Sequence, residues 1–199
     1  MSGLRFGAIV LAAGKSSRMG RNKLLITING RMVIDRLLDV LEDTVDKIVV
    51  VTGYNPESIQ NAVKSRDIKL VHNSEFEKGM TSSVRAGLSI VRDMDAVFLV
   101  PGDQLGIDAN LIEKMKKTII EDQEALIVSP IFEGKRGHPI LFRNLLFNDV
   151  LLLSEEMTLR DLVKRYEFAH RFVESDEWCT RDFDTPNDLE NAKKYWQSN

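Results

Sequence analysis

The sequence has a single cysteine, Cys179, among 199 residues. One cysteine can form neither an internal disulfide bond nor a cysteine cluster that holds zinc, so the count is compatible with a reducing compartment. Proline and glycine are also scarce, at 5 and 12 residues, below the share typical of disordered chains. Because hydrophobic residues make up 43% of the chain, we expect an ordinary globular core.

A long hydrophobic run is missing as well. The apolar stretch at residues 6–13 is too short to cross a membrane. Glycine and basic residues follow it, where a signal peptide would have a small-residue cleavage site. The sequence therefore predicts a soluble cytoplasmic protein with no membrane partner.

Neither sign of charge dominates. There are 27 Lys and Arg residues against 30 Asp and Glu residues, a net charge of −3. A protein that binds nucleic acid is usually basic, so this balance argues against a nucleic-acid partner. It does not exclude a small anionic substrate, because a local group of basic residues does not show in the total.

The pattern that is present is an alternation of strands and helices. A continuous apolar run at residues 6–13 and a second buried-type segment at 47–52 predict strands. Three further strands are expected at residues 68–72, 96–100 and 125–131. Between them, helical spacing occupies residues 32–41, 81–91 and 111–120, and Pro56 begins a further helix. This order predicts an α/β fold with a Rossmann-like open, mostly parallel sheet and helices on both faces. Ligands of such sheets bind at the carboxyl ends of the strands.

The pattern changes at about residue 133. Residues 133–139 are rich in turn formers, and residues 140–142 and 169–174 read as short strands. Residues 143–153 and 158–166 read as helices, and a last helix runs from Thr185 and Pro186 to about Trp196. No linker is visible. We expect one domain over residues 1–199, with a core at about 1–132 and an elaboration of that core at about 133–199.

The loop after the first strand carries the clearest chemical signal. The small residues Ala12, Ala13 and Gly14 let the backbone approach a ligand, and consecutive amide groups in a turn can bind an anion. Four basic residues follow within nine positions: Lys15, Arg18, Arg21 and Lys23. This combination suits a polyphosphate, although the spacing matches neither familiar phosphate loop. The alternative is a solvated basic surface loop.

Residues 11–25 resemble the signature loop of the nucleotidyltransferases related to molybdenum cofactor guanylyltransferase. The Ala-Ala-Gly at 12–14 is similar to the molybdenum cofactor cytidylyltransferase branch of that family. Four further segments extend the resemblance over nearly the whole chain: Asn73 with 78–84, Gly-Asp-Gln at 102–104, Arg-Gly-His-Pro at 136–139, and 182–189. The resemblance implies an enzyme with a Rossmann-like fold that moves a CMP moiety from CTP to the phosphate of molybdopterin, bound to molybdenum, and releases pyrophosphate.

Three alternatives stay open. The enzyme could be the guanylyl version that uses GTP, or it could transfer a nucleotide to another phosphorylated small molecule. It could also be a non-catalytic pterin carrier with a molybdoenzyme as its partner. The presence of Arg18, Lys23, Asp103 and Asp184 together favours an enzyme, because a carrier does not need both carboxylates.

The same resemblance assigns the site. Asp103 follows an apolar strand and Asp184 lies in a second acidic segment, and both are expected to bind Mg²⁺, with Asp182 in reserve. Arg18 and Lys23 are expected to hold the phosphates during catalysis. The remaining expected nucleotide contacts are Leu11, Ala12, Ala13, Gly14, Asn73, Ser82 and Ser83. As alternatives, Asp103 could cap the next helix, and Asp184, Ser82 and Ser83 could be ordinary helix-start residues.

The acceptor side is less well matched. His138, held between glycine and proline, and Arg160 are the expected acceptor contacts, and a structural turn histidine is the alternative for His138. Residue 105 is leucine where the family usually has proline. Residues 155–160 keep Arg160 and an acid but lack the branch's glycines, so the acceptor itself could differ. Met80 is expected to pack in the core.

Overall fold

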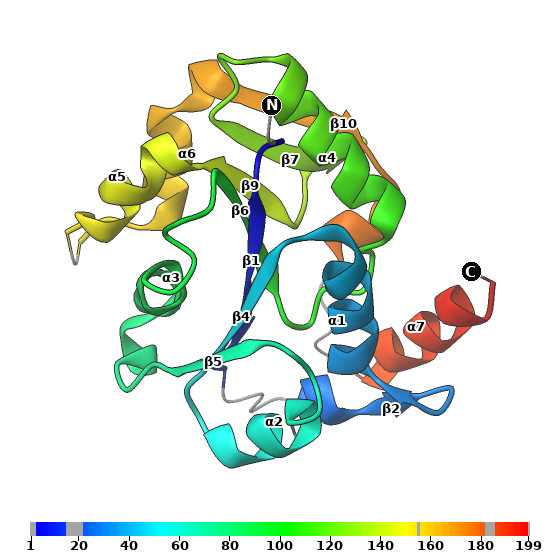
Figure 1. The fold of residues 1–199 in the computed structure, drawn as a ribbon. Helices are drawn as coiled ribbons and strands as arrows, with labels where there is room; N and C mark the ends of the chain where they lie inside the picture. The colour runs from blue at the N-terminus through cyan, green and yellow to red at the C-terminus, as the bar shows by residue number, and fades with distance from the viewer. Residues whose placement is uncertain (1–2, 15–21, 155, 182–185, 199) are drawn as a thin grey trace.

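The computed structural model describes residues 3–14, 22–154, 156–181 and 186–198 (Figure 1). Within these residues, an eight-stranded sheet has the order β10-β7-β9-β6-β1-β4-β5, with β8 paired to β7. Its strands are β1 Phe6–Ala12, β4 Lys47–Thr52, β5 Lys69–His72, β6 Ala96–Pro101, β7 Ile127–Phe132, β8 Lys135–Arg136, β9 Ile140–Arg143 and β10 His170–Glu174. A separate antiparallel hairpin joins β2 Thr27–Ile28 to β3 Arg31–Met32.

The sheet is mostly parallel, as the alternation predicts. β1 pairs in parallel with β4 on one side and with β6 on the other, β4 with β5, and β7 with β10. The exception is β9, which runs antiparallel between β6 and β7. The carboxyl ends of β1, β4 and β6 therefore lie together at one edge.

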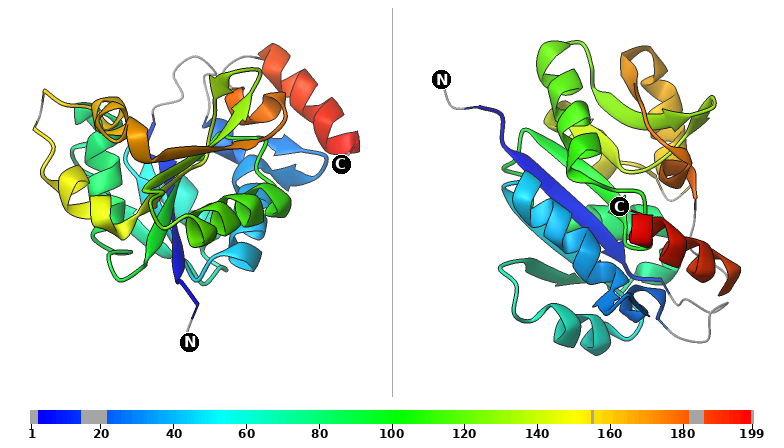
Figure 2. Two further views of the ribbon diagram at one scale, coloured as in Figure 1. Left: turned by 90° about the horizontal axis from the view of Figure 1, so that it is seen from above. Right: turned by 90° about the vertical axis from the view of Figure 1, so that its right-hand side faces the viewer.

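Helices cover both faces of the sheet (Figure 2). They are α1 Val33–Thr44, α2 Pro56–Val63, α3 Met80–Leu88, α4 Ala109–Glu121, α5 Phe147–Leu151, α6 Leu159–Arg165 and α7 Pro186–Ser198. Short 3-10 helices, η2 Lys23–Leu25, η3 Phe76–Lys78, η4 Asn144–Leu146, η5 Glu167–Ala169 and η6 Glu177–Thr180, connect these elements.

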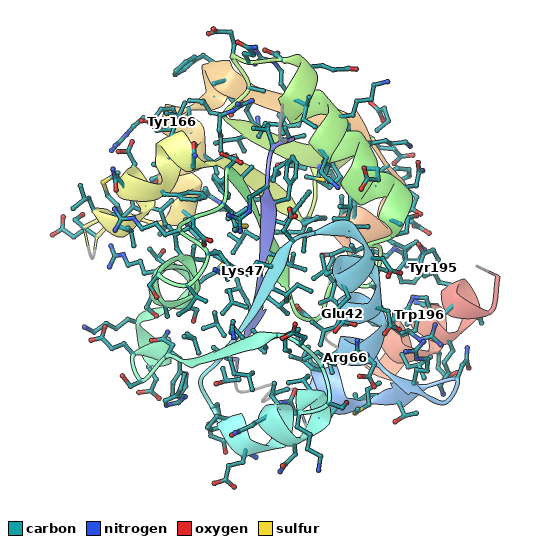
Figure 3. The ribbon with its side chains drawn as sticks, in the orientation of Figure 1. Glu42, Lys47, Arg66, Tyr166, Tyr195 and Trp196 are labelled. Atoms are coloured by element: carbon teal, nitrogen blue, oxygen red, sulfur yellow. The ribbon has the colours of Figure 1, made fainter. Side chains whose placement is uncertain are left out.

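Alternate residues of β1 divide the core into two layers. Phe6, Ala8 and Val10 pack with α1, α2 and α4, whereas Ile9 packs with α3, α5 and α6. This is the period-two alternation of a strand with both faces covered. On the first face, the guanidinium group of Arg66 donates hydrogen bonds to three carboxylates of α1. They belong to Asp35, Asp39 and Glu42, the last at 2.6 Å (Figure 3).

A third, smaller core holds the carboxyl end of the chain. Ile28, Val33, Leu105 and Ala192 are buried together, so α7 packs against the β2–β3 hairpin and the segment after β6. The guanidinium carbon of Arg36 lies 4.6 Å from the ring centre of Trp196 in this region. No described helix is both long and apolar enough to cross a membrane.

The predicted strands are confirmed, and Lys47–Thr52 has the bounds expected from the sequence. The helix predicted over residues 143–153 is wrong at its start. Arg143 is the last residue of β9, and a 3-10 turn separates it from α5. Its guanidinium binds main-chain oxygens at the end of α4 and just beyond, including that of Ala125 at 3.0 Å, so long-range contacts hold this residue in the sheet.

Candidate active site

A pocket of about 470 Å³ opens at the carboxyl ends of β1 and β6, beside the start of α3. This is the edge at which ligands bind in open α/β sheets. Its lining combines the backbone strip after β1, the start of η2, the η3–α3 turn and the segment after β6: Leu11, Ala12, Ala13, Gly14, Asn22, Lys23, Leu24, Phe76, Glu77, Gly79, Met80, Ser83, Pro101 and Asp103.

The strip at residues 11–14 forms one wall of the pocket. The Leu11 carbonyl accepts a hydrogen bond from Gly102 N at 3.0 Å, and the Ala13 carbonyl accepts one from Tyr54 N at 3.2 Å. The Ala12 and Ala13 side chains are buried, whereas a β-carbon on Gly14 would have no described residue within 4 Å. The fixed backbone with small side chains leaves this wall open to a ligand.

Two opposite charges meet across the pocket. Lys23 Nζ and Asp103 Oδ2 form an ion pair, and each side chain is about one-fifth exposed, at 18% and 20%. Lys23 is the first residue of η2, and the Asn22 side chain caps this turn by accepting from Leu24 N at 3.1 Å. Asp103 is not the cap of the next helix, because Asp108 has that role and accepts from Leu111 N at 2.7 Å.

The buried side-chain amide of Asn73 supports the pocket wall at the start of α3. Asn73 follows β5, and its Nδ2 donates to Ser82 Oγ at 2.8 Å and to Ser83 Oγ at 3.0 Å. Its Oδ1 accepts from Glu75 N at 3.0 Å. Ser83 lines the pocket, whereas Asn73 and Ser82 are outside the set of lining residues. Asn73 therefore lies behind the pocket wall and holds in place the hydroxyl group of Ser83, which lines the pocket.

The start of α3 faces the same space. Gly79 precedes the helix with φ 94° and ψ −175°, a conformation that is costly for any residue with a side chain. The partial positive charge of a helix amino terminus favours a bound anion. Met80, which the sequence placed in the core, is instead 53% exposed and lines the pocket, because it is the first helical residue.

Sequence reasoning missed Phe76 and Glu77, which line the pocket from η3. Phe76 packs closely on the chain after β4: a β-carbon on Gly53 would lie 2.6 Å from the Phe76 β-carbon. Gly53 is therefore required for the ring to sit against the pocket. The available signal was the glycine directly after a buried strand, which marks a close approach.

The expected acceptor residues are outside this pocket. The His138 amide donates to the Cys179 carbonyl at 2.8 Å, which places the turn at 137–139 against η6. Arg160 is exposed on α6. Three residues predicted for the site, Arg18, Asp182 and Asp184, lie outside the described residues, and so do Lys15 and Arg21.

The pocket offers limited protein ligation for a metal ion. Among the described residues, no group of three or more His, Cys, Asp or Glu side chains could hold one. Asp103 and Glu77 are the two described carboxylates in the lining. One or two carboxylates fit a hard cation such as Mg²⁺, which takes its other ligands from phosphate oxygens and water.

The pocket lies at the carboxyl edge of a mostly parallel α/β sheet, where such folds bind their ligands, and its lysine and helix amino terminus suit a phosphate-bearing ligand. Comparison with known proteins identifies the family: the chain belongs to the MobA-like NTP transferase domain family, whose profile matches residues 8–171, and it is a nucleotidyltransferase. The resemblance stated from the sequence is thereby confirmed at the level of the family.

Two curated relatives cover nearly the whole chain. The molybdenum cofactor cytidylyltransferase of Escherichia coli K12 is 25% identical over 187 residues, covering 94% of each chain. A probable molybdenum cofactor guanylyltransferase of Natranaerobius thermophilus is 27% identical over 199 residues, covering 94% of this chain and 95% of the relative.

Solved structures share the fold. A nucleotidyl transferase from Methanothermobacter superposes with a TM-score of 0.82 at 21% identity and covers 99% of this chain and 100% of its own. A Mycobacterium tuberculosis H37Rv protein in complex with manganese has a TM-score of 0.74 at 22% identity, with coverage of 96% and 98%.

Proposed function

We propose that this enzyme transfers a CMP moiety from CTP to the phosphate of molybdopterin, with or without bound molybdenum, and releases pyrophosphate. The observation that carries the proposal is the ion pair of Lys23 and Asp103 in a pocket whose other wall is the bare strip at residues 11–14. In this pocket, the ammonium group of Lys23 and the carboxylate of Asp103 would both be near a bound triphosphate.

The reaction needs positioning and charge stabilisation more than covalent work by the protein. An oxygen of the acceptor phosphate attacks the α-phosphorus, and the bond between that phosphorus and the bridging oxygen to the β-phosphate breaks. An acceptor phosphate is already ionised near neutral pH, so no general base is required. Lys23 stabilises the negative charge that builds on the phosphoryl oxygens, and Arg18 holds the β- and γ-phosphates.

The proposed metal is Mg²⁺, bound by Asp103 and Asp184. The proposal is supported by the carboxylate of Asp103 in the pocket and by the family, one solved relative of which holds manganese. When bound, the ion neutralises charge on the triphosphate and on the leaving group. Asp103 also holds the ammonium group of Lys23 in the pocket, so the two residues share one electrostatic environment.

The choice of CTP is supported by Ala13 at the position where guanylyltransferases often have glycine. The Ala13 β-carbon lies against the Gly53 and Phe76 region, where a β-carbon on Gly53 would be 2.9 Å from it. The relatives carry both cytidylyl and guanylyl names, so GTP is the alternative.

The deciding experiment measures pyrophosphate release with Mg²⁺, molybdopterin, and CTP, GTP or ATP in turn. We expect release with CTP at a kcat/KM at least tenfold above that with GTP. A clear preference for GTP would overturn the cytidylyl assignment and leave nucleotidyl transfer intact. If wild-type protein releases no pyrophosphate with any of the three nucleotides, molybdopterin is not the acceptor, and another phosphorylated small molecule takes its place.

The matched variants are Asp103→Ala and Glu121→Ala. Glu121 is an exposed carboxylate at the end of α4, away from the pocket lining. Removing a metal ligand costs several kcal/mol of transition-state stabilisation, so Asp103→Ala should lower the rate by at least about a hundredfold. Glu121→Ala should retain the wild-type rate.

A further inference from the structure

The carboxylate of Asp103 is presented by a tight turn at the end of β6. Gln104 N donates to the Pro101 carbonyl at 3.1 Å, which closes a four-residue β-turn with Asp103 at its third position. Next to β1, Gly102 N donates to the Leu11 carbonyl at 3.0 Å, and a β-carbon on Gly102 would lie 2.8 Å from that oxygen. The turn is therefore fixed to the pocket wall at its start.

The side chain of Gln104 provides a second fixed point. It is only 5% exposed, and its Nε2 donates to the main-chain carbonyl of Trp178 at 2.6 Å. Trp178 belongs to η6, 74 residues further along the chain. Gln104 is outside the set of pocket-lining residues, so it acts on the ligand space through its neighbour Asp103. That neighbour lies between two anchors, one on β1 and one on η6.

η6 is a firm support for this bond because it packs closely on two other segments. A β-carbon on Gly106 would lie 2.5 Å from the Trp178 β-carbon. The His138 amide donates to the Cys179 carbonyl at 2.8 Å, and a β-carbon on Gly137 would collide with the same oxygen. The Cys179 side chain is fully buried. These close approaches leave η6 little freedom to follow a loosened turn.

The position of the Asp103 carboxylate matters because Mg²⁺ is a demanding ion. It requires near-ideal octahedral geometry at about 2.0–2.1 Å, so a ligand that moves by a fraction of an ångström binds less well. The partners that orient metal ligands contribute about 10–100-fold in metal affinity or activity. The same turn also sets where the charge of Lys23 lies, since Lys23 and Asp103 form an ion pair.

We infer that Gln104 is a positioning residue for the proposed reaction. Through its bond to the Trp178 carbonyl, it holds the turn that directs the Asp103 carboxylate at the metal ion. The inference rests on the proposed function, because it assumes that Asp103 binds the metal. Gln104 is absent from the site predicted from the sequence, and the bond to η6 that defines its role joins two distant segments.

The test measures how much a metal ion strengthens CTP binding. Calorimetry gives the dissociation constant of CTP with a chelator and again with saturating Mn²⁺, and we call the ratio of the two constants the metal gain. Gln104→Leu should lower the metal gain about three- to tenfold, because one hydrogen bond is lost, and should leave metal-free binding unchanged. Asp103→Ala, which removes the ligand itself, should lower the metal gain at least as much.

Gln104→Glu separates the hydrogen bond from the packing of the side chain. The shape is kept, but an ionised carboxylate cannot donate to the Trp178 carbonyl, whereas a protonated carboxyl group can. Burial raises the pKa of a carboxyl group, so the metal gain should be low at pH 8 and within about twofold of wild type at pH 5.5. Wild-type protein measured at both pH values is the reference.

Two further variants are controls. Gln60→Glu makes the same chemical change at an exposed position of α2 and should keep the wild-type metal gain and stability. Thr44→Val removes a bond from a buried hydroxyl group to the Val40 carbonyl within α1. It should lower the free energy of unfolding in urea and leave the metal gain unchanged.

Three results would overturn the inference: a wild-type metal gain in Gln104→Leu, an equal loss in Thr44→Val, or a loss in Gln104→Glu that persists at pH 5.5. If any of them occurs while Asp103→Ala lowers the metal gain, the positioning role is wrong and the proposed function stands. If Asp103→Ala keeps the wild-type metal gain, Asp103 does not bind the metal. The metal role in the proposed function and this inference are then both wrong.

Discussion

Lys23 and Asp103 form an ion pair across the pocket, one from the first residue of η2 and the other from the segment after β6. A triphosphate would meet the positive charge of Lys23, and its accompanying cation would meet the negative charge of Asp103. The pair holds both side chains at the pocket. Under the proposed function, a triphosphate would compete with Asp103 for Lys23, and a cation would compete with Lys23 for Asp103.

Replacement of Lys23 by methionine should abolish most activity and leave the fold intact. Methionine keeps the length of the side chain but removes the charge that stabilises the phosphoryl oxygens. By analogy with the loss of one transition-state donor, we expect kcat/KM to fall by about 10²–10³. Steady-state pyrophosphate release measures the effect. Lys117→Met, at an exposed position of α4, is the control, and an equal loss there would refute the assignment.

Replacement of Asn73 by alanine should weaken nucleotide binding without removing a ligand contact. The variant loses the donors to Ser82 and Ser83 and the acceptor of the Glu75 amide, and leaving such groups unsatisfied costs about 1–3 kcal/mol. We expect a higher dissociation constant for CTP by calorimetry. Asn61→Ala, on the exposed side of α2, should change neither affinity nor stability. Wild-type affinity in Asn73→Ala would show that Ser83 needs no support.

Two glycines of the pocket should respond differently to alanine. At Gly79 the backbone has φ 94°, so alanine should lower the free energy of unfolding by about 1–3 kcal/mol. At Gly14 the added carbon meets nothing within 4 Å among the described residues, so stability should be unchanged while CTP affinity falls. Urea unfolding and calorimetry separate the two effects. Equal destabilisation by both substitutions would contradict this account.

His170 should make the protein less stable in mild acid. Its ring is buried, Nε2 lies 2.9 Å from Ser129 Oγ, and Nδ1 has no hydrogen-bond partner among the described residues. Burial, with a contribution from the charge of Arg136, lowers the pKa of His170 from 6.5 to about 4. Because the folded-state pKa is depressed, the stabilisation is complete above pH 6.5 and is lost as pH falls from 6.5 to 4.

The loss amounts to about 3 kcal/mol, at about 1.4 kcal/mol per pKa unit. It is measured by urea unfolding at pH 7, 5.5 and 4. His170→Gln should remove this part of the pH dependence, whereas His72→Gln, at an exposed position, should retain it. Identical pH profiles for the wild type and His170→Gln would show that His170 does not titrate on unfolding.

The sequence predicted the parallel strands because their signal is local. Residues 48–51 are apolar without interruption, and both faces of β4 are buried. The sequence did not predict that β9 runs antiparallel between β6 and β7, because strand order depends on contacts between distant segments. The same reason explains the error at Arg143, whose helical surroundings in the sequence are overridden by its place in the sheet.

The residues of the candidate site also divide into those that the sequence predicted and those that it did not. Ala12, Ala13, Gly14, Lys23 and Asp103 carry a recognisable motif, and the structure brings all five to one pocket. The role of Asn73 behind the wall could not be predicted, since it depends on hydrogen bonds to α3. Phe76 packs on Gly53, and although that glycine signals a close approach, the local sequence does not tell which distant segment approaches it.

The position of β9 has a consequence for how the protein is made. β6 pairs with β1 on one side and with β9 on the other, so one of its edges stays bare until residues 140–143 have left the ribosome and folded back. A fragment that stops at residue 132 would carry the nucleotide pocket beside an open, apolar strand that invites aggregation. The two parts of the chain cannot be exchanged as independent modules, because the second part closes the sheet of the first.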